Sequence, residues 1–106
     1  MTPQEAGILN QLKAKLQERL SVSRLVLFGS RARGDADPDS DMDVLVVLDG
    51  AADAKAEDYV RLCAWEAGVE QGIIVVPVMV SRAEWQDGPL SSSLLALAVE
   101  KEGVAI

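Results

Sequence analysis

The chain has 106 residues, room for one domain with a hydrophobic core, and its 17 acidic and 10 basic residues give a net charge of −7. This acidity argues against direct binding to a nucleic-acid backbone, which attracts basic surfaces, and suits a basic protein partner. The longest apolar run, residues 73–80, is far shorter than the roughly 20 residues that a membrane-spanning helix needs, so no membrane segment is expected.

Two features of the composition narrow the chemistry. The single cysteine, Cys63, cannot form a disulfide within the chain, and the first residues do not resemble a secretion signal, so we expect a reducing, cytoplasmic location. Histidine is absent, which excludes Ser-His-Asp and Cys-His nucleophilic sites and the usual zinc sites within this chain. A bound metal ion would be held by oxygen ligands, which suits magnesium, manganese or calcium.

The first predicted elements are a helix and two strands. Residues 2–5, Thr-Pro-Gln-Glu, form a capping box, and apolar residues at helical spacing then predict a helix that ends near Ser21. Residues 25–28 are a short β-prone run, and residues 42–48 are a longer run rich in valine and leucine. Both faces of the second strand are apolar, which is expected of a strand in the centre of a covered sheet.

A helix and a third strand follow. The helix is predicted over residues 53–68 with Cys63 on its inward side, where the thiol serves as a small buried hydrophobic group. Residues 73–80 are predicted to form a strand. Pro77 favours an edge position or a bulge for this strand, because proline cannot donate a backbone hydrogen bond.

The last predicted elements are helical. Residues 81–84, Ser-Arg-Ala-Glu, form a second capping box, and a final helix is predicted to follow Pro89 and to stop at Gly103. The element order is αβ(α)βαβα, with about three strands. This order predicts a single α/β domain over residues 1–106.

Five of the nine aspartates fall within residues 35–43. Like charges so crowded repel one another unless they are solvated, paired with arginines or bound to a cation. The first three flank a proline and are expected in an exposed loop, where Arg31 and Arg33 relieve part of the repulsion. Asp41 and Asp43 stand at the start of the apolar strand, where residues i and i+2 project from one face. Two carboxylates aimed one way make a site for a divalent metal ion.

Gly29 and Ser30 close the first predicted strand and open a helical turn. Glycine lets a phosphate approach the backbone, and a serine hydroxyl with exposed amides offers hydrogen-bond donors to an anion. If residues 31–40 fold the chain back, this pair lies beside Asp41 and Asp43. Phosphoryl-transfer chemistry needs such a layout, in which metal ions neutralise and orient the phosphates while backbone donors hold the leaving pyrophosphate.

The segments LFGSRARG and SDMDVLVV, with ten residues between Gly29-Ser30 and Asp41-Met42-Asp43, resemble the signature of the minimal nucleotidyltransferases (MNT) of the DNA polymerase β superfamily. The resemblance implies a mixed-sheet nucleotidyltransferase fold like the polymerase β palm. It also implies binding of a nucleoside triphosphate, with ATP as the expected nucleotide, together with two Mg²⁺ ions or with Mn²⁺. The implied reaction is nucleotidyl transfer, which releases pyrophosphate. Gly29 and Ser30 would hold the triphosphate, and Asp41 and Asp43 would be the metal-binding catalytic residues.

The chain departs from this family in one respect. Enzymes of the superfamily use a third carboxylate on a later strand, and the predicted strand at residues 73–80 contains no acid. Glu70 would take this role only if the strand began early. Two interpretations therefore stay open: an active nucleotidyltransferase, and a non-catalytic relative that acts as a binding or antitoxin subunit. A third, an α/β structural or metal-binding protein whose aspartate loop is only solvated surface, stays open beside them.

The resemblance also implies a partner. Small proteins of this kind are similar to antitoxins that are paired with a helical HEPN protein, an RNase toxin, and that silence it by AMP transfer onto a tyrosine. Trp65 and Trp85 are candidates for a docking surface, although burial in the core explains each of them equally well. Association of several copies of the chain stays open.

Overall fold

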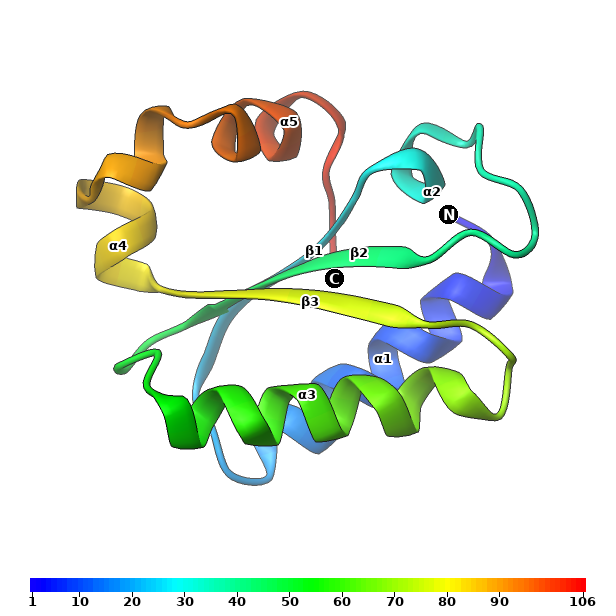
Figure 1. The fold of residues 1–106 in the computed structure, drawn as a ribbon, viewed down its shortest axis with the longest axis horizontal. Coiled ribbons are helices and arrows are strands. Elements are labelled where there is room, and N and C mark those ends of the chain that lie inside the picture. Colours follow the sequence, from blue (N-terminus) through cyan, green and yellow to red (C-terminus); the bar gives the residue numbers. More distant parts are fainter.

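A four-stranded sheet with helices on both faces forms the protein (Figure 1). The structure is a computed structural model that describes residues 1–106, apart from the side chains of residues 89 and 90. The helices are α1 (Pro3–Gln17), α2 (Ser30–Arg33), α3 (Ala54–Val69), α4 (Arg82–Asp87) and α5 (Leu94–Glu102), with a 3-10 helix at Pro89–Ser92. The strands are β1 (Val22–Phe28), β2 (Met42–Leu48), β3 (Val75–Ser81) and β4 (Val104–Ala105).

The strand order in the sheet is β3-β2-β1-β4. Strand β2 is antiparallel to β1 and parallel to β3, and β4 is antiparallel to β1, so the sheet is mixed. This topology confirms the predicted fold class, the central place of β2 and the edge position of β3. Pro77 lies in that edge strand, where its missing N–H leaves no gap in a second ladder.

The boundaries of the first two elements differ from the prediction. Helix α1 begins with the predicted capping box, but it ends at Gln17 rather than near Ser21. The amides of the next two residues bond three residues back, to Lys15 and Leu16, which tightens the chain into a turn. Strand β1 begins at residue 22 rather than 25, because its pairing with β2 continues past the apolar run.

The fourth strand is absent from the prediction. Val104 and Ala105 follow α5 and pair with Leu27 and Val26 of β1. Two residues are too few to show the alternating pattern that marks a strand in a sequence. The open edge of β1, which only the folded sheet creates, decides their conformation.

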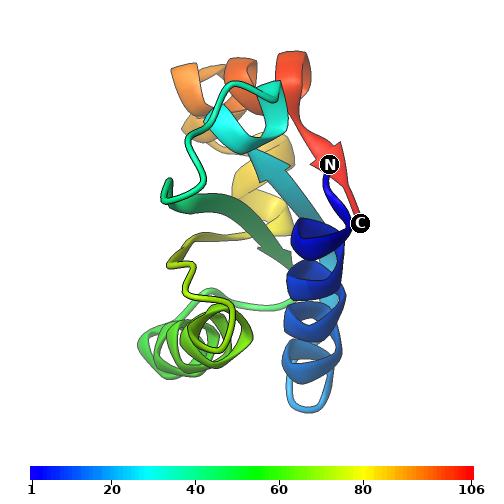
Figure 2. The ribbon, with the colours of Figure 1, turned by 90° about the vertical axis from the view of Figure 1, so that its right-hand side faces the viewer.

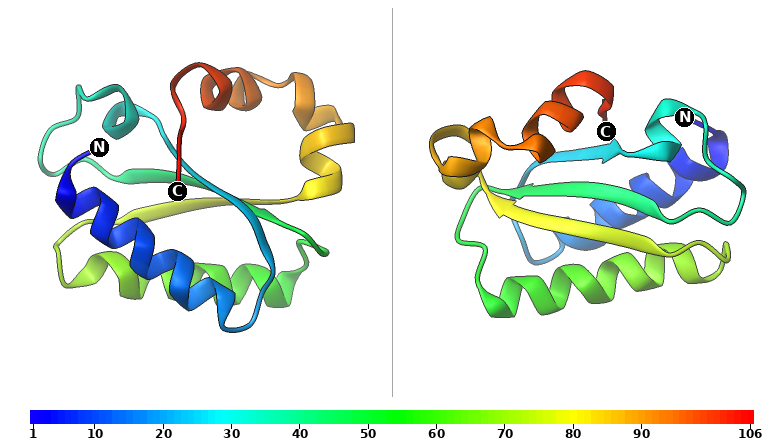
Figure 3. Two further views of the ribbon diagram at one scale, coloured as in Figure 1. Left: turned by 180° about the vertical axis from the view of Figure 1, so that it is seen from behind. Right: turned by 45° about the horizontal axis from the view of Figure 1, so that its top comes forward.

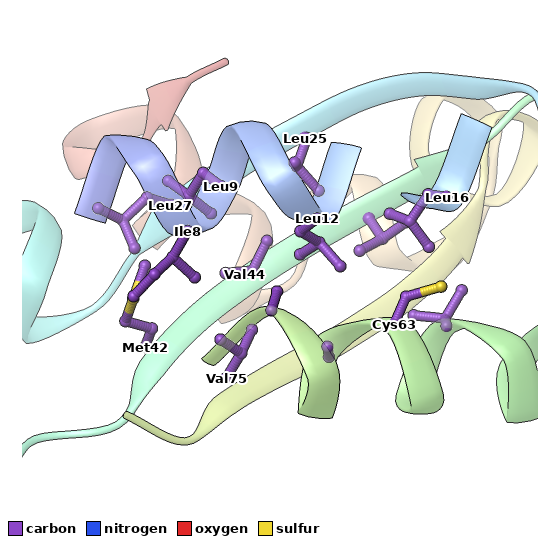
Figure 4. Packing of buried hydrophobic residues seen from close by; sticks show 14 of the residues in the cluster. Ile8, Leu9, Leu12, Leu16, Leu25, Leu27, Met42, Val44, Cys63 and Val75 are labelled. Atoms are coloured by element: carbon purple, nitrogen blue, oxygen red, sulfur yellow. The ribbon is translucent and has the colours of Figure 1, made fainter. Parts of the chain in front are cut away.

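Two hydrophobic clusters lie on opposite faces of the sheet. Helices α1 and α3 cover one face, and α4 and α5 cover part of the other (Figure 2). The larger cluster lies between the sheet and α1 and α3, and Figure 4 shows Leu9, Leu12 and Cys63 within it. Burial of Cys63 confirms its predicted role as a hydrophobic group.

The two tryptophans have different surroundings. Trp85 of α4 is 9% exposed and belongs to the smaller cluster, so of its two open interpretations the structure supports burial in the core. Trp65 of α3 is 59% exposed on the outer side of its helix. Among the described residues, no helix is both long enough and apolar enough to cross a membrane.

Alternation along β2 decides which face carries the candidate site. Val44 and Val46 belong to the cluster under α1 and α3, whereas Leu45 and Val47 belong to the cluster under α4 and α5. Successive side chains of a strand point to opposite faces, so Asp43 shares the face of the α4 and α5 cluster. Figure 3 shows α4 and α5 over one end of this face and α2 beside the other.

Candidate functional site

The site forms where β1 ends and β2 begins. Phe28 at the end of β1 is paired with Asp43 in β2, so Gly29 follows directly after the register partner of Asp43. Ser30 is the first residue of α2, and Asp41 immediately precedes β2. The antiparallel pairing of two neighbouring strands thus brings together the two motifs that the sequence predicts to work together.

The contact between Gly29 and Asp43 is close enough to require glycine. Gly29 caps α2 with φ +77° and ψ −159°, a region of backbone conformation that residues with a side chain rarely adopt. A Cβ built on Gly29 would overlap Oδ2 of Asp43. The carboxylate of Asp43 therefore lies directly against the backbone that leads into α2.

The two carboxylates of the site carry charge that the protein does not neutralise. Burial, and then the negative charge of Asp41, raise the pKa of Asp43, and Arg33 only partly opposes this. Among the described side chains, none forms an ion pair with Asp41 or Asp43. A carboxylate pair of this kind is the environment in which a divalent cation is stabilised.

The carboxylates of Asp41 and Asp43 suit a hard cation such as Mg²⁺, but two carboxylates alone do not fill its coordination shell. Carboxylate oxygens are the ligands that Mg²⁺ prefers, and Mg²⁺ in nucleotide sites is bound by one or two carboxylates together with phosphates and water. Within the described part of the chain, no group of three or more acidic, histidine or cysteine side chains could hold an ion. Asp41 and Asp43 could therefore hold Mg²⁺ together with oxygens from a nucleotide.

The sheet offers no third acid beside this pair. Asp43 is in register with Val76 of β3, and the Met42 amide bonds to the carbonyl of Ile74. Both β3-side residues are apolar and exposed, Val76 at 37% and Ile74 at 56%. Glu70 caps the C-terminus of α3, five positions before β3 begins, so the early strand start that would have placed it in the sheet does not occur.

The loop that precedes β2 confirms the predicted exposure of its aspartates. Its first three aspartates, Asp35, Asp37 and Asp39, are exposed to solvent. Arg33 lies 3.3 Å from a carboxylate oxygen of Asp35 and 2.9 Å from one of Glu102, so it relieves part of the repulsion as expected. Arg31 forms no ion pair with these aspartates; its guanidinium bonds to the carbonyls of Pro38 and Ser40 in their loop and to Glu5.

Arg31 and Glu5 form a buried pair that sequence reasoning missed. The Arg31 guanidinium lies 3.1 Å from the Glu5 carboxylate, and both side chains are almost fully buried. Burial opposes ionisation of Glu5, but hydrogen bonds from the Thr2 amide and from Arg31 outweigh it, so the pKa of Glu5 is lowered. The sequence carries no signal for this pair, because its members are 26 residues apart and Glu5 already satisfies a local capping motif.

The fold is shared with solved toxin-antitoxin structures. A toxin-antitoxin crystallised with AMP-PNP has a TM-score of 0.61 and 21% identity, with coverage of 91% of this chain and 69% of that one. A variant of the toxin-antitoxin MntA-HpeT has a TM-score of 0.62 and 18% identity, with coverage of 98% of this chain and 72% of that one. The structure of the tri-AMPylated Shewanella oneidensis HEPN toxin in complex with MNT antitoxin has a TM-score of 0.56 and 19% identity, with coverage of 96% of this chain and 70% of that one. These likenesses show the fold.

A relative and a family model match this chain in sequence. A Methanocaldococcus jannaschii protein named “Putative protein adenylyltransferase MJ0141” is 31% identical over 61 residues, which are 58% of this chain and 62% of that protein. This chain thus matches less than two-thirds of the length of that relative. The family model described as “Nucleotidyltransferase domain” matches residues 9–91, which contain both motifs of the site and strands β1 to β3. The chain therefore belongs to the nucleotidyltransferase domain family.

Proposed function

We propose that the protein is a nucleotidyltransferase that transfers AMP from ATP onto a protein partner, with residues 1–106 acting as one minimal domain. One observation carries the proposal: the Asp43 carboxylate lies against the Gly29 backbone, beside Asp41. The segment suited to a triphosphate and the segment suited to its metal ions therefore meet at one place. An ordinary solvated loop would not need a carboxylate placed against a backbone with positive φ.

Each residue of the site has a role in this proposal. Gly29 and Ser30 would hold the triphosphate: the missing Cβ of Gly29 makes room for the Asp43 carboxylate, and the Ser30 hydroxyl with the first amides of α2 would donate hydrogen bonds to phosphate oxygens. Asp41 and Asp43 hold Mg²⁺, two ions in the complete site, with Mn²⁺ as a substitute. Magnesium held there would supply positive charge to neutralise and orient the phosphates, and pyrophosphate would be the leaving group of the transfer.

The partner in this proposal is a HEPN-type helical protein, and the role is that of a cytoplasmic antitoxin. The support comes from relatives: one structural neighbour is a tri-AMPylated HEPN toxin in complex with MNT antitoxin, and another holds AMP-PNP. The curated relative is named as a protein adenylyltransferase. The net charge of −7 also suits a basic protein surface better than a nucleic acid.

A specific observation favours a second candidate, a non-catalytic member of the family that binds its partner without transfer. Val76 occupies the register position beside Asp43 at which a third carboxylate would complete the metal site. Without that acid, no side chain of β3 is placed to accept the proton of an attacking hydroxyl. Nucleotide binding and antitoxin function do not require this step.

Calorimetric titration of magnesium-ATP tests the site. We expect binding by the natural protein and its loss in the Asp41→Asn/Asp43→Asn variant. The matched control is Asp37→Asn/Asp39→Asn, which removes the same charge at exposed positions of the loop that precedes β2 and should bind as the natural protein does. Equal binding by all three proteins would contradict the assigned site.

Transfer of label from α-labelled ATP to a co-expressed HEPN-type partner separates the two candidate functions. Labelled partner with the natural protein and none with the Asp41→Asn/Asp43→Asn variant would establish the transferase. Binding of magnesium-ATP without any labelled partner would favour the non-catalytic subunit.

A further inference from the structure

The further inference concerns Arg31, whose side chain joins three parts of the chain. Its Nε donates to the carbonyl oxygen of Ser40 at 2.8 Å, and Nη2 donates to the carbonyl oxygen of Pro38 at 2.8 Å. Its Nη1 donates to the Glu5 carboxylate at 3.1 Å. Arg31 is 7% exposed, although arginine is almost never buried unless it is paired.

The position of Arg31 in the chain gives these bonds a consequence for the site. Its backbone directly follows Ser30, and the carbonyl that it holds at Ser40 directly precedes Asp41. One side chain thus cross-links the segment proposed to hold phosphates to the segment proposed to hold metal ions. Other backbone bonds of the loop are local, such as the Ser40 amide to the Asp37 carbonyl at 3.0 Å.

Glu5 fixes the guanidinium from the other side. Its carboxylate accepts the Thr2 amide at 2.8 Å and Arg31 at 3.1 Å, so the capping box of α1 anchors the arginine. A guanidinium is planar and presents its donors in a rigid fork, whereas a lysine ammonium is a point charge on a flexible stem. The two carbonyl bonds therefore need arginine, and the ion pair alone does not.

We propose that Arg31 is a positioning residue for the metal-binding carboxylates. By holding the carbonyls of Pro38 and Ser40, it fixes Asp41 relative to Gly29 and Ser30 without touching the nucleotide. The inference rests on the proposed function, since a fixed spacing matters only if one ligand bridges the two segments. Outer groups that orient metal ligands typically change metal affinity by about 10- to 100-fold when they are removed.

Two variants separate positioning from stability. Arg31→Lys keeps a positive charge for Glu5 but loses the forked grip on the loop, whereas Glu5→Gln keeps the grip and loses the charge partner. Both should lower the melting temperature. Mn²⁺ binding in the presence of α,β-methylene-ATP, followed by electron paramagnetic resonance, should weaken about 10-fold or more in Arg31→Lys and less than about two-fold in Glu5→Gln.

Amide exchange in the nucleotide-free protein provides a second readout that does not depend on binding. Arg31→Lys should speed exchange of the Ser40 amide, which bonds to the Asp37 carbonyl, while the Met42 amide, bonded to the Ile74 carbonyl, serves as the internal reference. Glu5→Gln should leave the ratio of the two rates unchanged. If Arg31→Lys fails to fold, the Glu5→Gln/Arg31→Gln variant replaces it, because that variant leaves no buried charge unpaired.

The outcomes are distinct. Unchanged Mn²⁺ binding in Arg31→Lys, or a loss of binding in both variants in proportion to their melting temperatures, would overturn the positioning role. Failure of the natural protein to bind Mn²⁺ with α,β-methylene-ATP would overturn the proposed function instead. In that case, faster exchange of the Ser40 amide in Arg31→Lys would still show that Arg31 holds the loop through the carbonyls of Pro38 and Ser40, and unchanged exchange would contradict this.

Discussion

The two ends of the face that carries the candidate site have different construction. Under α4 and α5, side chains such as Leu45 and Val47 are fully buried, and valine is a residue type that favours strands. At the end beside α2, Gly29 has a positive φ, the charge of Asp41 acts on Asp43, and no described side chain forms an ion pair with either aspartate. The covered end stabilises the fold, whereas the open end retains unfavourable features that a ligand could relieve.

The opposite face of the sheet, under α1 and α3, carries the larger hydrophobic cluster. A cavity in this cluster should lower the free energy of unfolding more than any other change considered below. Leu12 of α1 is completely buried in the larger cluster (Figure 4). Leu12→Ala should lower the free energy of unfolding by about 3–4 kcal/mol, because it removes buried methyl groups and leaves a cavity. The exposed Leu94→Ala is the control and should change it by less than about 0.5 kcal/mol in urea unfolding. Equal effects would contradict the assignment of the core.

Loss of the buried ion pair should come next in size. Glu5→Gln should cost about 2–3 kcal/mol at pH 7, because it leaves the Arg31 charge buried without its counter-ion. The pKa of Glu5 is lowered on folding, so its stabilisation is present above its ordinary pKa and is lost as pH falls through the folded-state value. Urea unfolding at several pH values should therefore show the difference between variant and natural protein shrinking in acid. A difference independent of pH would contradict this account.

Two glycines with positive φ allow a matched test of the open end. Gly29→Ala should cost about 2–3 kcal/mol of unfolding free energy, because it combines backbone strain with displacement of Asp43. Gly34→Ala also places a side chain at positive φ, but in open space, and should cost about 1 kcal/mol. Only Gly29→Ala should abolish magnesium-ATP binding in calorimetry. Loss of binding in both variants would show that strain in α2 alone, without the contact to Asp43, impairs the site.

The smallest effect should have the opposite sign. The raised pKa of Asp43 means that ionisation of this group opposes folding above its ordinary pKa. Asp43→Asn should therefore raise the melting temperature at pH 7, and this gain should disappear in acid, where the aspartate of the natural protein is protonated. Magnesium with ATP should raise the melting temperature of the natural protein and not that of the variant. A variant less stable than the natural protein at pH 7 would contradict the raised pKa of Asp43.

Local sequence patterns determined much of this protein. Both capping boxes depend on hydrogen bonds within a few residues of the chain, so the sequence predicts them. The helix predicted over residues 53–68, observed over 54–69, and the strand at 42–48 were found from their local pattern of apolar residues. The sequence predicted that the two motifs meet if residues 31–40 fold the chain back, and the antiparallel pairing of β1 with β2 meets this condition.

Only the tertiary structure decided the rest. Strand β4 forms because β1 has a free edge. Val76 lies beside Asp43 because of the register of β2 and β3. Arg31 contacts Glu5 because the sheet places α2 near the N-terminus of α1. Each of these contacts joins residues that are far apart in the chain. Their formation depends on the packing of whole elements, which no short sequence pattern encodes.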